Sequence, residues 1–210
     1  MFLRPTFSLA LTPLVFWTAS APISNPLAPL QDETTKWSVL TYTQHYTDDQ
    51  SEDVNYHGTL FVQLAKVSLA NCNLTLTVLL QDRYTGTITV QQTLHMRTTD
   101  VGQKSQTSSY DYLLPLANLH QLAFTIATGR PMQIPSHSGF HCTEEPACKL
   151  TWLQLKIPSP QISETRQTDG FIDFNQMVDD ITIPMSSTQA AQNSSAAIRE
   201  LAEACRVPHP

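Results

Sequence analysis

Strict alternation of apolar and polar residues is the feature that most restricts how this chain folds. In residues 73–80 an apolar side chain occupies every second position from Leu74 to Leu80. A period of two places these side chains on one face of a β-strand. Threonine, which suits the half-exposed surface of a pleated strand, occurs 26 times, whereas charged residues make up only 14% of the chain. The sequence therefore predicts a protein built mainly of β-strands.

The same alternation recurs along most of the chain and is interrupted by polar segments. Those polar segments, residues 48–58, 97–109 and 158–170, are expected to be loops. Expected strands cover residues 37–46, 59–69, 73–80, 86–96, 110–116, 121–128 and 148–157, with two shorter pieces at 171–174 and 180–184. The pattern predicts a bent sheet or barrel of about seven or eight antiparallel strands.

The last segment of the chain has a different period. Over residues 187–206 small or apolar residues recur every three or four positions, which is typical of a helix with one apolar face. Ser186 and Gln189 fit a capping box at its start, and Pro208 marks its end. Because its apolar face is narrow and rich in alanine, the helix would be marginal alone and is expected to lie against the sheet.

A run of strands followed by one final helix resembles, from about Tyr56 to Arg206, the pleckstrin-homology-like fold. That resemblance implies a strongly bent antiparallel sheet whose open end is plugged by the helix. A β-sandwich, or a lipocalin-like barrel with a trailing helix, would show the same order of elements. Some pleckstrin-homology-like proteins bind phosphoinositide headgroups through basic loops. This chain has no such loop, so that activity is not implied.

The N-terminal part of the chain is expected to lie outside the folded domain. Arg4, an apolar run and small residues at 19–21 have the layout of a signal peptide, here residues 1–21. The run is about half of the roughly 20 residues that span a membrane, and an uncleaved anchor is the alternative. Residues 22–35, with three prolines, are expected to be a Pro-rich extended linker. The predicted product is a single β-rich domain over residues 36–207, secreted or periplasmic, with no membrane-spanning segment once the leader is removed.

Four cysteines, an even number in an exported chain, indicate two disulfides. Cys142 and Cys148 lie close together in sequence, and a bond between them would close a short loop. That arrangement leaves Cys72 to pair with Cys205, which would tie the C-terminal helix to the sheet. This pairing is favoured, although four cysteines allow three connectivities and the crossed pairings stay open.

The segment from His137 to Cys148, HSGFHCTEEPAC, is also a weak candidate for a metal site. His137, His141 and Cys142 carry nitrogen and sulfur ligands suited to zinc or copper. The glycine and prolines in and beside the segment disfavour a helix, so the spacing of the two histidines does not place them on one helical face. No CxxC pair is present either. The disulfide is therefore preferred, and no bound metal or cofactor is expected.

The charge of the chain and the motifs that it lacks argue against several classes of function. The net charge of -6 and the scattered lysines and arginines argue against nucleic acid as a partner. The chain has neither a GxSxG nucleophile elbow nor a glycine-rich phosphate loop, and its other histidines are dispersed singly. The sequence therefore favours an exported, non-catalytic binding or interaction protein of unknown ligand. A small secreted hydrolase with a histidine and a carboxylate, and a metal-binding protein using His137, His141 and Cys142, are the alternatives.

Two N-glycosylation sequons begin at Asn73 and Asn193. The first lies in an expected strand beside Cys72, and the second lies in the expected helix. Both would matter only in a eukaryotic host.

Overall fold

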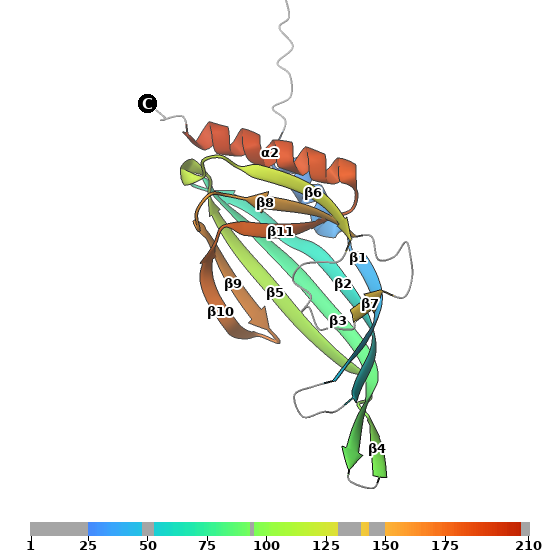
Figure 1. The fold of residues 1–210 in the computed structure, drawn as a ribbon. Coiled ribbons are helices and arrows are strands. Elements are labelled where there is room, and N and C mark those ends of the chain that lie inside the picture. The colour runs from blue at the N-terminus through green and yellow to red at the C-terminus, as the bar shows by residue number, and fades with distance from the viewer. Residues whose placement is uncertain (1–24, 48–52, 93–94, 130–139, 143–149, 207–210) are drawn as a thin grey trace, which may run out of the picture.

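The computed structural model of the protein describes residues 25–47, 53–92, 95–129, 140–142 and 150–206 (Figure 1). The expected signal peptide, residues 1–21, lies outside these ranges. Within them the chain is mainly β, with two sheets followed by a C-terminal helix. None of the helices in the described ranges is long and apolar enough to cross a membrane.

Among the described residues, eight strands form a twisted antiparallel sheet in the order β10-β9-β5-β3-β2-β1-β7, with β4 paired to β3. They are β1 (Ser38–Thr47), β2 (Asp53–Ala70), β3 (Asn73–Gln92), β4 (His95–Asp100), β5 (Lys104–Pro115), β7 (Phe140–Cys142), β9 (Ile162–Thr168) and β10 (Phe171–Val178). The smaller sheet has the order β11-β8-β6 and consists of β6 (Ala123–Gly129), β8 (Leu150–Lys156) and β11 (Asp180–Met185). Figure 1 shows that the small sheet covers only one end of the large one, so that β2, β3 and β5 continue beyond it.

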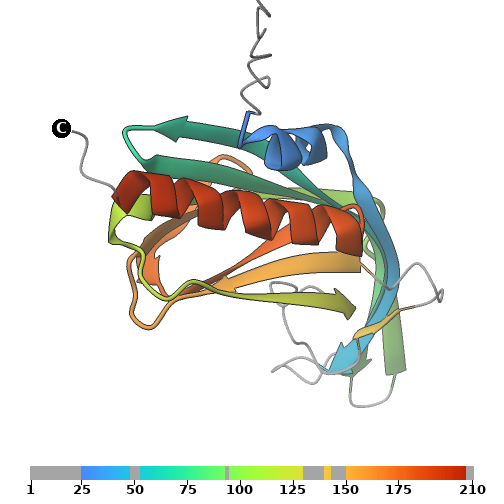
Figure 2. The same ribbon diagram turned by 90° about the horizontal axis from the view of Figure 1, so that it is seen from above.

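Helix α2 (Thr188–Arg206) lies across the end of the molecule where the two sheets come together (Figure 2). It packs beside α1 (Ala28–Gln31) and the short turn η2 (Leu116–Asn118), and it lies against the three strands of the smaller sheet. Its buried residues are Ala191, Ser194, Ala197, Ile198, Leu201 and Ala202. The helix predicted over residues 187–206 is therefore confirmed.

The predicted bent antiparallel sheet with a trailing helix is also confirmed. The described strands do not close into a barrel, so the arrangement is not the lipocalin-like alternative. The described ranges hold eleven strands, divided between two sheets, where the sequence predicted seven or eight.

The core lies between the two sheets and under α2. Alternate residues of the two longest strands enter it, as predicted: Leu60, Val62, Leu64, Leu74, Leu76, Val78 and Leu80. In β8 the consecutive residues Trp152 and Leu153 are both buried, because this central strand of the small sheet contacts β1 as well as α2. A strand covered on both faces is apolar on both.

Three polar segments that were expected to be loops belong in part to strands. β2 begins at Asp53, β5 begins at Lys104, and β9 starts at Ile162. The physical cause is that these strands carry many polar residues where they extend beyond the small sheet, so the apolar alternation that marks a strand is missing there. β3 also runs unbroken from Asn73 to Gln92, where the sequence predicted two strands.

Residues 28–35 form helical turns, so the extended linker predicted for residues 22–35 was wrong over this part. Pro29 lies in the first turn of α1, where the fixed φ of proline suits a helix, and η1 (Asp32–Thr35) follows directly. Leu30 is fully buried in the core. Tertiary contacts therefore hold this segment on the domain, and no local periodicity reveals them.

Glu33 joins the N-terminal segment to the start of α2. Its carboxylate, only 3% exposed, accepts hydrogen bonds from the backbone N–H of Ser186 at 2.6 Å and from the Ser186 hydroxyl at 3.0 Å. The helix is capped one residue later, where the Ser187 hydroxyl oxygen accepts a hydrogen bond from the N–H of Ala190 at 3.1 Å. The predicted capping box of Ser186 and Gln189 was therefore wrong by one residue, because Ser186 is engaged by Glu33.

A disulfide between Cys72 and Cys205 ties the tip of the β2–β3 hairpin to the last turn of α2, across 133 residues of sequence. Asn71 and Cys72 form the turn with φ values of 49° and 60°, as a two-residue hairpin of type I′ requires. The structure thus contains the Cys72–Cys205 pairing that the sequence favoured. Cys148 and the side chain of Cys142 lie outside the described residues, so the second bond stays a prediction.

Replacing Leu201 by aspartate is expected to detach α2 from the sheets. Leu201 is buried on the apolar side of the helix, and a carboxylate there would be an unpaired charge in the core. We expect the free energy of unfolding, measured by urea denaturation, to fall by about 3 kcal/mol or more. Glu200→Ala, on the exposed side of α2, is the control and should change it by less than about 0.5 kcal/mol. An unchanged melting temperature for Leu201→Asp would contradict the placement of the helix.

Removing the disulfide by the double substitution Cys72→Ser and Cys205→Ser is expected to lower stability strongly. The bond closes a very long loop and so restricts the unfolded chain, for which chain entropy gives about 5 kcal/mol as an upper figure. Urea denaturation of the oxidised wild type and of the double variant measures the loss. Amide hydrogen exchange in the last turn of α2 should also become faster. Equal stability of the two proteins is the result that excludes a structural role for this bond.

Candidate functional site, a groove on the outer face of the large sheet

The part of the large sheet that extends beyond the small one has two different faces. Directly paired residues of neighbouring strands point to the same face, so the register assigns each residue to a side. Tyr42 in β1 pairs with Gly58 in β2, and this row faces inward because Tyr42 belongs to the core. The neighbouring row of Thr41, Thr59 and Arg83 therefore faces outward.

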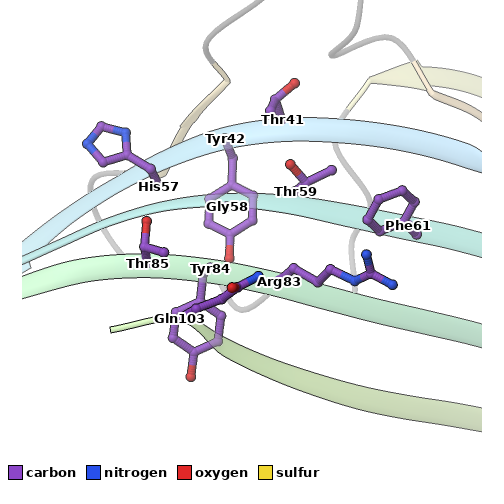
Figure 3. Close-up of a pocket in the computed structure, with 10 residues that line it drawn as sticks. All are labelled: Thr41, Tyr42, His57, Gly58, Thr59, Phe61, Arg83, Tyr84, Thr85 and Gln103. Atoms are coloured by element: carbon purple, nitrogen blue, oxygen red, sulfur yellow. The ribbon is translucent and has the colours of Figure 1, made fainter. Parts of the chain in front are cut away.

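The outward row lines a groove of about 440 Å³ (Figure 3). Strand β2 contributes three alternate residues to it, and Thr59 lies between the larger side chains of His57 and Phe61. The short threonine side chain leaves room that a larger residue would fill. The described lining consists of the outward residues Thr41, His57, Thr59, Phe61, Arg83 and Thr85, together with Gln103 and with Tyr42, Gly58 and Tyr84 of the neighbouring inward row.

Arg83 is the one permanently charged residue in the described lining. Its guanidinium carbon lies 5.2 Å from the centroid of the Phe61 ring, within the range of cation–π attraction. Trp37 meets the same ring edge-on, with centroids 6.4 Å apart. Arg83 is exposed and forms no ion pair with a carboxylate in the described part of the chain. The guanidinium is therefore supported by an aromatic ring while its N–H groups are open to a ligand.

Behind the groove, on the inner face, the Tyr42 hydroxyl donates a hydrogen bond of 2.7 Å to the carboxylate of Asp82. The Tyr42 ring reaches Asp82 by crossing Gly58 of the intervening strand, and Figure 3 shows the ring behind β2. A Cβ atom at Gly58 would lie 2.4 Å from this ring, so only glycine leaves room for it. The pair thereby connects β1 to β3 beneath the backbone that forms the floor of the groove.

Burial governs the ionisation of this pair. It raises the pKa of Asp82 above the ordinary value, and the hydrogen bond from Tyr42 opposes part of that rise. The pKa of the Tyr42 hydroxyl is also raised, first by burial and then by its hydrogen bond to the Asp82 carboxylate, so Tyr42 stays a donor. The second carboxylate oxygen of Asp82 is buried and has no hydrogen-bond partner among the described residues. The protonation of Asp82 is therefore coupled to the stability of the fold.

The inner face holds a second arginine, and its surroundings differ from those of Arg83. The guanidinium of Arg166 lies 5.5 Å from the centroid of the Tyr110 ring, and its Nε lies 3.1 Å from a carboxylate oxygen of Asp173. Arg166 thus combines an aromatic contact with a partly exposed intramolecular ion pair. Arg83 has only the aromatic contact within the described residues, so its charge has no carboxylate partner there.

Most of the residues proposed for a metal site lie outside the described residues or have side chains that the structure does not describe. His137 and Cys148 are outside the described ranges. His141 and Cys142 belong to β7, where the backbone of His141 pairs with Thr43, but their side chains are not part of the description. Among the described residues, no three His, Cys, Asp or Glu side chains come together as metal ligands. Metal binding by this segment and the Cys142–Cys148 bond both stay predictions.

The described histidines do not assemble with a carboxylate. His57 lies in the groove, whereas Asp82 lies on the opposite face of the sheet. In the described part of the chain no ion pair or side-chain hydrogen bond joins a carboxylate to any of His45, His57, His95 and His120. The hydrolase alternative stays a prediction.

Sequence reasoning did not find this groove. His57 fell in the segment 48–58 that was expected to be a loop, and Arg83 fell between two expected strands. The alternation of His57, Thr59 and Phe61 is a local signal that marks one face of a strand. They lie beside Arg83 because of the register between β2 and β3. The sequence pattern within one strand does not reveal that register.

Comparison of the chain with family models, with curated proteins and with solved structures found no match. The resemblance to the pleckstrin-homology-like fold therefore rests on the order of strands and helix alone. The chemistry of the groove is interpreted from its own geometry and charge.

Replacing Asp82 by asparagine is expected to change how stability depends on pH. Because burial raises the pKa of Asp82 above its value in the unfolded chain, the folded state holds this proton more tightly. The stability that this gives is present below about pH 4 and is lost as the pH rises through the raised pKa. Between pH 4 and 7 the free energy of unfolding of wild type should therefore fall relative to that of Asp82→Asn, as measured by urea denaturation.

Tyr42→Phe is the matched variant for this test. Loss of the hydrogen bond should lower the free energy of unfolding by about 1–2 kcal/mol. It should also raise the pKa of Asp82 further and move the pH-dependent loss of stability to higher pH, because this bond favours the ionised carboxylate. A constant difference between wild type and Asp82→Asn across this pH range would show that Asp82 titrates as it does in the unfolded chain.

Proposed function

We propose that this protein is an exported, non-catalytic binding protein that holds a small polar ligand in the outer groove. The proposal rests on one observation about Arg83. Its exposed guanidinium lies over the ring of Phe61 and has no carboxylate partner among the described residues. It lines a groove of about 440 Å³, a size typical of small-molecule sites.

The composition of the lining supports binding over catalysis. A general acid–base couple needs two titratable groups in different environments that reach one ligand. The described outward lining offers His57, threonines, a glutamine and an arginine, and it includes no carboxylate. Such side chains can orient a ligand through hydrogen bonds and charge.

Export is supported by the chemistry of the cysteines and by the leader. The Cys72–Cys205 bond is of the kind that persists in oxidising compartments. The basic, apolar and small-residue layout of residues 1–21 agrees with passage into such a compartment. We therefore propose a secreted or periplasmic site of action.

Filling the groove with the variant Thr59→Trp is expected to abolish ligand binding. Thr59 lies in the middle of the groove, and an indole there would occupy the space between His57 and Phe61. The experiment is a thermal-shift screen of wild type against neutral saccharides, acidic saccharides, amino acids and short peptides. A compound that binds the groove should raise the Tm of wild type and leave the Tm of Thr59→Trp unchanged.

Thr125→Trp is the matched control, because Thr125 is an exposed threonine on a strand of the other sheet. It should respond to the ligand as wild type does. If the ligand raises the Tm of Thr59→Trp as much as that of wild type, the ligand binds elsewhere and the groove is not its binding site. A screen in which no compound raises the Tm of wild type would count against the proposed function for all four compound classes.

A further inference from the structure

We propose that the ligand of the groove is a saccharide that carries a carboxylate, such as a uronic acid; this inference rests on the function proposed above. Three properties of the groove lead to it. They are the one permanent charge of its described lining, its polar hydrogen-bonding side chains and its place in the middle of the sheet.

The charge of the groove matches one carboxylate. A guanidinium presents a planar fork of N–H donors that fits a carboxylate with two parallel hydrogen bonds. The cation–π contact of Arg83 with the Phe61 ring restrains that fork before a ligand arrives. Because Arg83 is the one permanent charge in the described lining, the site suits a ligand with a single negative charge. Polyanions are bound by clusters of lysine and arginine, and the described lining has no such cluster.

The remaining side chains match hydroxyl groups. Thr59, Thr85, His57 and Gln103 line the groove, and none of these side chains has a hydrogen-bond partner among the described residues. Threonine hydroxyls, the imidazole and the amide can each donate and accept, as the hydroxyls of a sugar ring do. They are spread over β2, β3 and the connection that precedes β5, so they can contact several hydroxyls of one ring at once.

The position of the groove disfavours a peptide. Its floor is β2, which is paired with β1 on one side and β3 on the other, so its backbone N–H and C=O groups are used within the sheet. An extended peptide binds by adding a strand to a free edge, and a peptide carboxylate is captured by free backbone N–H groups. The β2 floor of the groove offers neither. Recognition there depends on side chains, which suits a compact ligand rich in hydroxyls.

The test measures binding of glucuronate, galacturonate, glucose, galactose and propanoate to the full chain by isothermal titration calorimetry. We expect each uronate to bind at least tenfold more tightly than the matching neutral sugar and than propanoate. Arg83→Lys keeps the charge but loses the planar fork, so it should weaken uronate binding at least tenfold. Arg97→Lys, at an exposed position of β4, is the matched control and should bind as wild type does.

The outcomes separate this inference from the proposed function. If a uronate and its neutral sugar bind equally, and Thr59→Trp abolishes the binding of both, the proposed preference for a carboxylate is wrong. The groove is then still a binding site. If propanoate binds as tightly as the uronates, the proposal that the ligand is a saccharide is wrong. Full uronate affinity in Arg83→Lys would overturn the role of the guanidinium fork. If no uronate binds, or if Thr59→Trp binds uronates as wild type does, the inference is wrong. The proposed function then depends on the other compounds of the thermal-shift screen.

Discussion

The pairing of β2 with β3 is the interaction on which the rest of the structure depends. Side chains alternate between faces along a strand, so one register decides at once which residues enter the core and which face solvent. Toward the hairpin tip this register sets Val62 against Leu80 in the core. Farther along, the same register sets Thr59 against Arg83 on the outer face. The core and the groove are therefore two parts of one hairpin.

The two ends of this hairpin are held in different ways. Its tip is bonded through Cys72 to the end of α2, and the start of α2 is joined through Glu33 to the N-terminal segment. Covalent and buried polar contacts thus close the apolar end of the domain. The other end has less apolar cover, and there the buried hydrogen bond from Tyr42 to Asp82 links β1 to β3 behind the groove. A site built on paired strands is positioned more precisely than one built on loops.

The groove shows how a single glycine can determine the packing beneath a site. Gly58 admits the Tyr42 ring on the inner side and leaves the outer side to its neighbours in β2. The two arginines show why surroundings matter more than residue type. Arg166 is neutralised by Asp173 within the protein, whereas Arg83 has a ring for support and no described carboxylate partner. Only the second arrangement leaves a charge for a ligand.

The sequence by itself determined the strands at the apolar end and the helix over residues 187–206, because alternation and helical period are local properties. It favoured the Cys72–Cys205 bond, but the structure supplied that pairing, because a cysteine count does not select a connectivity. Only the tertiary structure decided that polar segments such as Ile162–Thr168 are strands and that residues 28–35 pack on the domain. It alone placed Arg83 beside Phe61 and Thr59. Those contacts join residues of different strands through register and docking, and no pattern within one segment encodes which partner a strand will meet.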